Sequence, residues 1–177
     1  MRSLTKKRVT ALVTAAMLLA LGLVLPSLVG NIKEIGDSLL PMHLAVMLCG
    51  ILCGGWYGLG TGLMMPFLRA VFFGMPPLYP NAVWMALELA TYGLVIGLLY
   101  ARGKAYRRGY LFFCLVSSML LGRVVWGIAK AVLLGIGGKP FGWQAFFVGG
   151  FIDAVPGLLL QLVLIPLTVE LLEKRKK

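Results

Sequence analysis

The sequence has 177 residues, of which 60% are hydrophobic and 13% are charged, and its mean hydropathy is +0.93. These values lie far outside the range of soluble domains, so most of the chain is predicted to lie in a bilayer. Allowing for short connections, this length is used up by about six helices of roughly 20 residues, the length that crosses a hydrocarbon core. We therefore expect an all-α membrane protein, with residues 1–177 in a single integral membrane domain.

Six apolar stretches follow one another along the chain, separated by polar or glycine- and proline-rich breaks. The predicted transmembrane helices are 8–29, 41–56, 57–73, 81–101, 110–136 and 144–171. The second and third are short, so one of them is expected to be tilted or partly re-entrant, and a five-span alternative stays open. Basic residues precede the first stretch, but no small-residue cleavage site follows it, so it is interpreted as a helix and not as a signal peptide.

The net charge of +11 is concentrated on one side of this six-helix arrangement. Twelve of the 17 lysines and arginines lie before the first span, between the fourth and fifth, or after the last, and only Lys33 and Lys139 lie in the opposite loops. Cytoplasmic loops of membrane proteins carry such an excess of basic residues. Both termini are therefore predicted to be cytoplasmic, and the distribution argues against a nucleic-acid partner.

Five charged residues fall inside the predicted spans, where each costs at least about 2.5 to 3.5 kcal/mol to insert. They are Arg69, Glu88, Arg123, Lys130 and Asp153. They are expected either to pair with one another, for example Arg123 with Glu88 or Asp153, or to face a ligand. Since three are cations and two are anions, one positive charge is left for an anionic group of a ligand.

Two polar and aromatic stripes occur at helical spacing on the fourth and fifth spans. The first stripe consists of Asn81, Trp84, Glu88 and Tyr92, and the second of Arg123, Trp126 and Lys130. If they face each other, the two stripes line a pocket for a small molecule. Alternatively, Trp84 is an interfacial anchor near the outer surface. His43, near the outer start of the second span, is interpreted as a structural residue.

No motif for hydrolysis of a nucleotide or a peptide occurs in the sequence, so the chain is not expected to be an enzyme. Cys49, Cys53 and Cys114 lie in apolar stretches without the spacing of a zinc site, and neither a metal nor a cofactor is expected. On the first span, Ala11 and Ala15 form a small-xxx-small pair, which permits close approach of another helix.

Several segments of the chain resemble the substrate-binding S components of energy-coupling factor (ECF) transporters. The resemblance lies in the basic start with its alanine pair, the run LPMHLAVMLCG from Leu40 to Gly50, the glycine-rich reversal that follows, and the segments 69–77, 88–93 and 122–127. The run from Leu40 to Gly50, together with Met75-Pro-Pro77, is most similar to the subgroup assigned to pantothenate.

This resemblance implies a non-enzymatic, six-helix S component in the plasma membrane of a prokaryotic cell. Such a subunit captures a small vitamin or precursor from outside. It then docks through its first helix, here at Ala11 and Ala15, on a coupling membrane protein that two cytoplasmic ATPases drive. The implied substrate-binding residues are Asn81, Trp84, Glu88, Arg123, Trp126, Lys130 and Asp153.

Pantothenate is the expected substrate, because the unmatched positive charge favours a carboxylate-bearing vitamin and the resemblance favours this subgroup. Its carboxylate suits Arg123 or Lys130, its amide suits Asn81 and its hydroxyls suit Glu88. Pyridoxine, niacin, lipoate and a queuosine precursor are the alternatives within this class. A small membrane enzyme or an assembly factor is a separate alternative, since either can carry carboxylates and cations in its spans.

Overall fold

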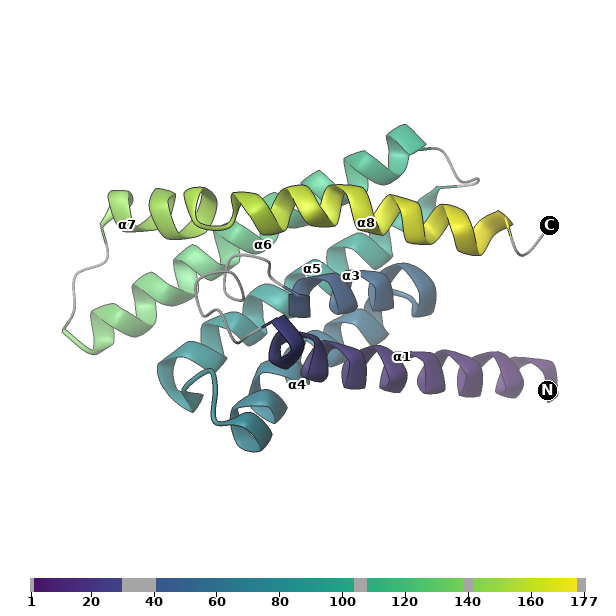
Figure 1. Cartoon of the computed structure of the whole chain (residues 1–177), viewed down its shortest axis with the longest axis horizontal. Coiled ribbons are helices and arrows are strands. Elements are labelled where there is room, and N and C mark those ends of the chain that lie inside the picture. The colour runs from purple at the N-terminus through teal and green to yellow at the C-terminus, as the bar shows by residue number, and fades with distance from the viewer. Residues whose placement is uncertain (1, 30–40, 104–107, 139–141, 175–177) are drawn as a thin grey trace.

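The computed structural model describes residues 2–29, 41–103, 108–138 and 142–174, and these ranges contain helices and no strands (Figure 1). The helices are α1 (Arg2–Val29), α3 (Pro41–Cys53), α4 (Gly55–Phe73), α5 (Val83–Arg102), α6 (Arg108–Ile136), α7 (Trp143–Phe147) and α8 (Val155–Lys174). Irregular turns, η1 (Leu78–Ala82) and η2 (Val148–Ile152), lead into α5 and α8. The predicted all-α class is confirmed, with a helical segment at each of the six predicted stretches when α7, η2 and α8 are taken as one.

Four helical segments of the described residues are long and apolar enough to cross a membrane. They are Thr5–Ser27, Leu78–Arg102, Gly109–Ile136 and Val148–Lys174. Helix α3 has 13 residues, and at 1.5 Å per residue it rises only about 20 Å, less than the roughly 30 Å of a hydrocarbon core. Membrane crossing by α3 and α4 therefore stays a prediction, as does the alternative in which one of them is re-entrant.

The reversal between α3 and α4 takes a single residue, Gly54, whose φ of 106° is a conformation that favours glycine. The sequence leaves two interpretations of Gly58 and Gly62, as part of this reversal or as a small-residue pair for internal packing, and the structure supports the second. These residues lie inside α4, where Gly58 faces Gly93 of α5 so closely that a Cβ atom on either would collide with the other's backbone. They are packing residues, and they bring α4 and α5 into direct backbone contact.

A matched pair of substitutions on α4 tests this packing. Gly58→Ala should lower the free energy of unfolding by about 1 to 3 kcal/mol, the usual effect of overpacking, because neighbouring backbone has to move. Gly60→Ala, two residues away, places its methyl group where no atom lies within 4 Å. We expect it to be neutral or mildly stabilising, since alanine favours a helix over glycine by up to about 1 kcal/mol. Thermal unfolding in one detergent compares them, and equal melting temperatures would contradict the packing role.

Helix α5 is the centre of the bundle, since it packs against α3, α4 and α6. One buried apolar cluster joins α5 to α3, α6 and α8 around Tyr92, Leu115 and Ile165, and a second joins it to α3 and α4 around Val46 and Met65. The outer faces of the helices carry many exposed large apolar side chains. An apolar surface of this extent is expected for helices that face lipid.

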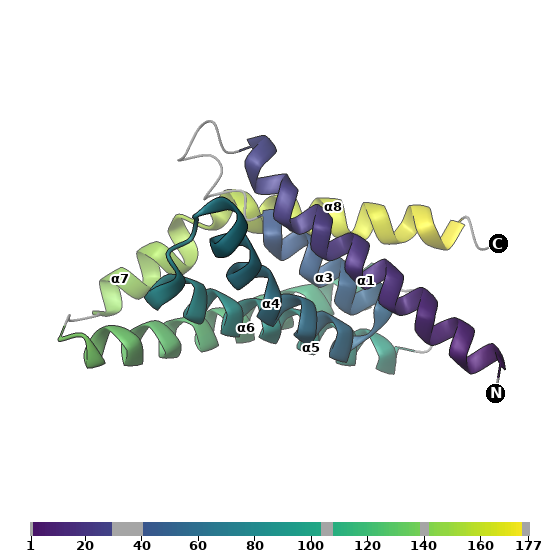
Figure 2. The ribbon, with the colours of Figure 1, turned by 90° about the horizontal axis from the view of Figure 1, so that it is seen from below.

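Both ends of the described chain lie at the same end of the bundle, as the two views agree (Figures 1 and 2). Helix α1 starts there and α8 finishes there. This arrangement is the one required if both termini are on the same side of a membrane. Which side that is stays a prediction from the distribution of basic residues.

Candidate functional site

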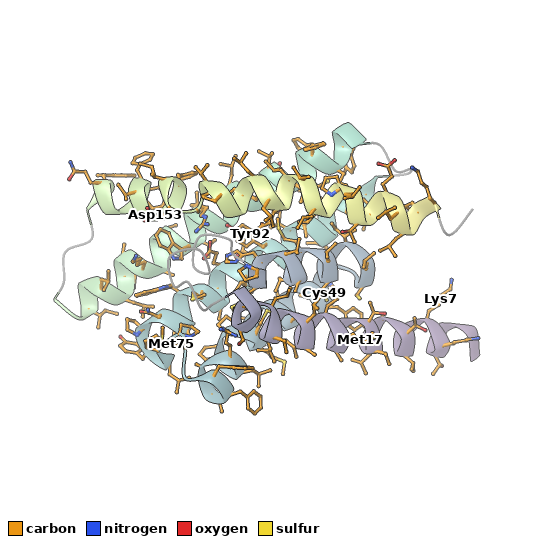
Figure 3. All side chains as sticks on the ribbon, viewed as in Figure 1. Lys7, Met17, Cys49, Met75, Tyr92 and Asp153 are labelled. Atoms are coloured by element: carbon orange, nitrogen blue, oxygen red, sulfur yellow. The ribbon has the colours of Figure 1, made fainter. Side chains whose placement is uncertain are left out.

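Glu88 is the centre of a buried polar cluster in the middle of the bundle, where its side chain is 2% exposed. Its Oε1 atom accepts a hydrogen bond from the Tyr92 hydroxyl at 3.1 Å and lies 2.9 Å from Nη1 of Arg123. The His43 Nε2 atom is 3.6 Å from the same oxygen. Side chains from α3, α5 and α6 thus converge on one carboxylate oxygen, beside Tyr92 as labelled in Figure 3.

Helical spacing and one glycine assemble this cluster. Glu88 and Tyr92 are four residues apart on α5 and therefore lie on the same face. On α6, Gly122 lies against the ring of Tyr92, and a Cβ atom there would collide with the ring. The absence of a side chain at this position lets α6 approach α5 closely enough for the next residue, Arg123, to reach Glu88.

Four nitrogen atoms of the cluster are buried and have no hydrogen-bond partner among the described residues. They are Nε and Nη2 of Arg123 and both ring nitrogens of His43. The two side chains are 4% and 3% exposed, respectively. A buried polar group without a partner costs about 1 to 3 kcal/mol, so atoms of this kind call for an explanation. The cluster is rich in donors that need an acceptor.

Two indole rings and a lysine extend the cluster along α6. The Lys130 Nζ atom lies 4.5 Å from the ring centre of Trp126 and 5.5 Å from that of Trp84. The Arg123 guanidinium carbon is 5.9 Å from the Trp126 ring centre. The stripes predicted on the fourth and fifth spans therefore do face each other. Trp84 is buried and contacts Lys130, which is not the position of an interfacial anchor.

Two of the predicted site residues lie at the margin of this cluster. Asn81 is half-buried in η1, three residues before Trp84. Asp153 is exposed just before α8, and its charge acts on Lys130 (Figure 3). Of the charged residues in the cluster, Glu88 and Arg123 are therefore buried, and Lys130 is half-buried.

Arg69 belongs to a different part of the bundle. Its Nη1 atom donates to the backbone oxygen of Leu23 at 2.7 Å and to the hydroxyl of Ser27 at 3.3 Å, both on α1. It also lies over the ring of Phe73, 5.1 Å from the ring centre. Arg69 thus ties α4 to α1 and takes no part in the charge balance of the cluster. With Arg69 outside the cluster, its two cations, Arg123 and Lys130, are equal in number to its two acidic residues, Glu88 and Asp153, so the excess positive charge expected from the sequence is not found there.

An apolar hollow of about 400 Å³ lies on another side of α6. Its lining residues are Val124, Gly127, Ile128, Ala131, Gly142, Trp143 and Phe146. None of the predicted site residues lines it. Phe146 packs at Gly127 and lies 6.2 Å from Trp126, ring centre to ring centre, so it stands between the hollow and the polar cluster.

A family model described as ECF transporter, substrate-specific component, matches residues 10–173. The chain belongs to this family. No curated protein and no solved structure matches it. S components are transporter subunits and not enzymes, which agrees with the expectation that the chain has no enzymatic activity. The family also implies a small-molecule substrate, a coupling membrane component and ATPases as partners. Because the match covers the family as a whole, it does not identify the pantothenate subgroup.

Within this S component, sequence reasoning missed His43 as a member of the cluster. The residue is the third of α3, and its ring meets the Tyr92 ring edge-on, with 5.1 Å between the ring centres. The available signal was chemical: His43 is the single histidine of the sequence and lies at the start of an apolar stretch. Tyr92 was placed on the correct stripe, but its bond to Glu88 depends on the rotamers of both side chains, which spacing does not fix.

Proposed function

We propose that this S component binds a small carboxylate-bearing vitamin at the polar cluster, with Arg123 as the main contact of the carboxylate. The observation that carries the proposal is that only one of the three guanidinium nitrogens of Arg123 contacts Glu88. Nη1 binds Glu88, whereas Nε and Nη2 have no hydrogen-bond partner within the part of the chain that the structure describes. Those two nitrogens lie on one edge of the guanidinium, and their parallel N–H groups match the two oxygens of a carboxylate.

The surroundings of Arg123 suit the same class of substrate. Lys130 lies beside the Trp126 ring on the same helix and adds a second cation near the site, which attracts an anionic ligand group. Trp84 and Trp126 provide flat apolar walls beside it. Asn81 and Asp153, at the margin of the cluster, are the candidates for the polar groups at the other end of the ligand. Pantothenate remains our best candidate, ahead of niacin and lipoate, which are also carboxylates.

The test of this function is to identify the small molecule that copurifies with the detergent-solubilised protein. The protein is denatured and the supernatant analysed by mass spectrometry, with the Arg123→Ala variant as the matched control. We expect a carboxylate-bearing vitamin with the wild-type protein, and much less of it with the variant. Recovery of a neutral or cationic vitamin in equal amounts from both proteins would refute the proposed substrate class.

For coupling, we propose that α1 docks on the membrane coupling protein through its exposed face. Ala15 is only 7% exposed and faces the bundle, and Ala11 is half-buried. The next small pair, Ala16 and Ala20, is exposed. Since two small residues four positions apart permit close helix contact, this pair is better placed for a partner than Ala11 and Ala15.

The proposed orientation places the shared end of α1 and α8 in the cytoplasm, where the ATPases act. It is supported by the basic residues at this end, which include Lys6, Lys7 and Arg8. In a protein without its native cysteines, Arg102→Cys should be protected from an impermeant thiol reagent outside the cell, whereas Gly137→Cys should be labelled. Labelling of Arg102→Cys with protection of Gly137→Cys would show that the orientation is the opposite of the proposed one.

A further inference from the structure

His43 has a geometry that a purely structural histidine does not need. Its side chain is 3% exposed, and neither ring nitrogen has a hydrogen-bond partner in the described ranges of the chain. The nearest acceptor is Oε1 of Glu88, but the distance of 3.6 Å from Nε2 is too long for a hydrogen bond. Oε1 is also already taken by Arg123 and Tyr92. Glu88 therefore does not satisfy His43, although it lies beside it.

We propose that His43 is a second ligand-binding residue, which donates to the same carboxylate that Arg123 binds. The inference rests on the proposed function and assigns a further residue to that site. Either tautomer of a neutral imidazole carries one N–H donor. A carboxylate offers about four lone-pair sites, so it accepts two bonds from the edge of Arg123 and still has room for a third donor.

The placement of both side chains around Glu88 supports a shared ligand group. Arg123 reaches Oε1 of Glu88 from α6 and His43 approaches it from α3, to 2.9 Å and 3.6 Å. The unsatisfied nitrogens of the two side chains therefore belong to one buried cluster around Glu88. In the proposed complex, the ligand carboxylate lies between α3 and α6 and accepts hydrogen bonds from both side chains.

This arrangement predicts that His43 contributes to the selectivity for an acid over its neutral analogue. A hydrogen bond to a charged group contributes roughly 10- to 150-fold to affinity, whereas one between neutral groups contributes about fivefold. Loss of the His43 donor should thus weaken binding of the acid more than binding of a neutral compound of similar shape. Loss of a residue that only supports the fold should weaken binding of the acid and of the neutral compound equally.

The experiment measures the affinity of the purified full-length protein for three matched pairs of probes. These are pantothenate and pantothenol, nicotinate and nicotinamide, and lipoate and lipoamide, each differing at the carboxylate. For the pair that binds, His43→Ala should reduce the preference for the acid by about 2- to 30-fold, the difference between losing a charged and a neutral hydrogen bond. His43→Gln keeps an N–H donor and should recover part of the preference. The control is Thr61→Val. Thr61 is also buried and polar, but its hydroxyl bonds Cys49, so this variant should leave the preference for the acid unchanged.

The outcomes separate this inference from the function on which it rests. If wild-type protein binds a neutral analogue as tightly as its acid, or binds none of the six probes, the carboxylate proposal fails and the role of His43 fails with it. If wild-type protein prefers the acid and His43→Ala keeps that preference in full, only the role of His43 is wrong. If His43→Ala does not fold, the His43→Gln variant is measured in its place. A preference for the acid equal to that of the wild-type protein then counts against the role of His43, and a reduced preference supports it.

Discussion

Replacement of Arg123 by alanine is expected to weaken binding of the carboxylate ligand by about 2 to 5 kcal/mol, the range for removing one partner of a buried charge pair. The ligand then loses its two parallel donors in a desolvated site. Arg123→Lys should recover only part of the affinity, because an ammonium group does not reproduce the edge of the guanidinium. Isothermal titration with the copurifying vitamin measures both variants.

The contact with Glu88 adds a second effect of the same substitution, which has to be separated from the first. Without Arg123, the buried carboxylate of Glu88 loses its cation at 2.9 Å, and the ligand-free protein should lose about 3 to 5 kcal/mol of stability. In the double variant Arg123→Ala/Glu88→Gln no buried charge is left unmatched at this pair. It should therefore regain most of the stability but none of the affinity. If the double variant binds the ligand normally, Arg123 is only a structural partner of Glu88.

The double variant Ala16→Trp/Ala20→Trp is expected to abolish vitamin uptake while leaving the affinity of the isolated protein within about twofold. Both alanines are exposed on α1, and the binding cluster lies on α3, α5 and α6, so bulk at these positions blocks close approach of a partner helix without touching the site. Transport is measured as uptake of radiolabelled vitamin into cells that contain the complete transporter. The affinity is measured by titration of the purified variant.

Two controls define what the uptake result means. Val163→Trp adds bulk to an exposed position of α8 and should leave uptake intact, since it tests lipid-facing bulk alone. Ala15→Trp places the indole at a position that is 7% exposed, so it should lower the melting temperature as well as uptake. Loss of uptake in the Val163→Trp variant would show that any large side chain on the lipid-facing surface interferes, and the docking role of α1 would then lose its support.

Much of the fold was predictable from the sequence because membrane helices are read from length and hydropathy. The six apolar stretches lie where the helical segments occur, and the stripes on the fourth and fifth spans face each other, which was the condition for a pocket between them. Helical spacing places Trp84 and Glu88 on one face of α5 whatever the tertiary structure is. The facing of α5 and α6 followed from the cost of charge in lipid, which drives Glu88 and Arg123 inward together.

What was not predictable depends on contacts between segments far apart in the sequence. The sequence left open whether Gly58 belongs to a turn or packs inside a helix, because a glycine that allows close packing and a glycine that breaks a helix look alike in a single sequence. Arg69 was counted among the charges of the spans without its partner, a backbone oxygen 46 residues earlier that no side-chain pattern indicates. His43 was set aside for the same reason, since its place in the cluster depends on how α3 lies against α5.

The bond between Arg123 and Glu88 has a consequence for the part of a transport cycle in which no cargo is present. An empty carrier with a lone buried arginine would hold an uncompensated charge at membrane depth after each release, and its return to the loading state would be slow. In the proposed site, Glu88 stays bound to Nη1 when the ligand leaves the opposite edge of the guanidinium, so the pair remains neutral. The same contact keeps the guanidinium oriented between turnovers, and the next molecule meets a preorganised receptor that needs little entropy loss to engage.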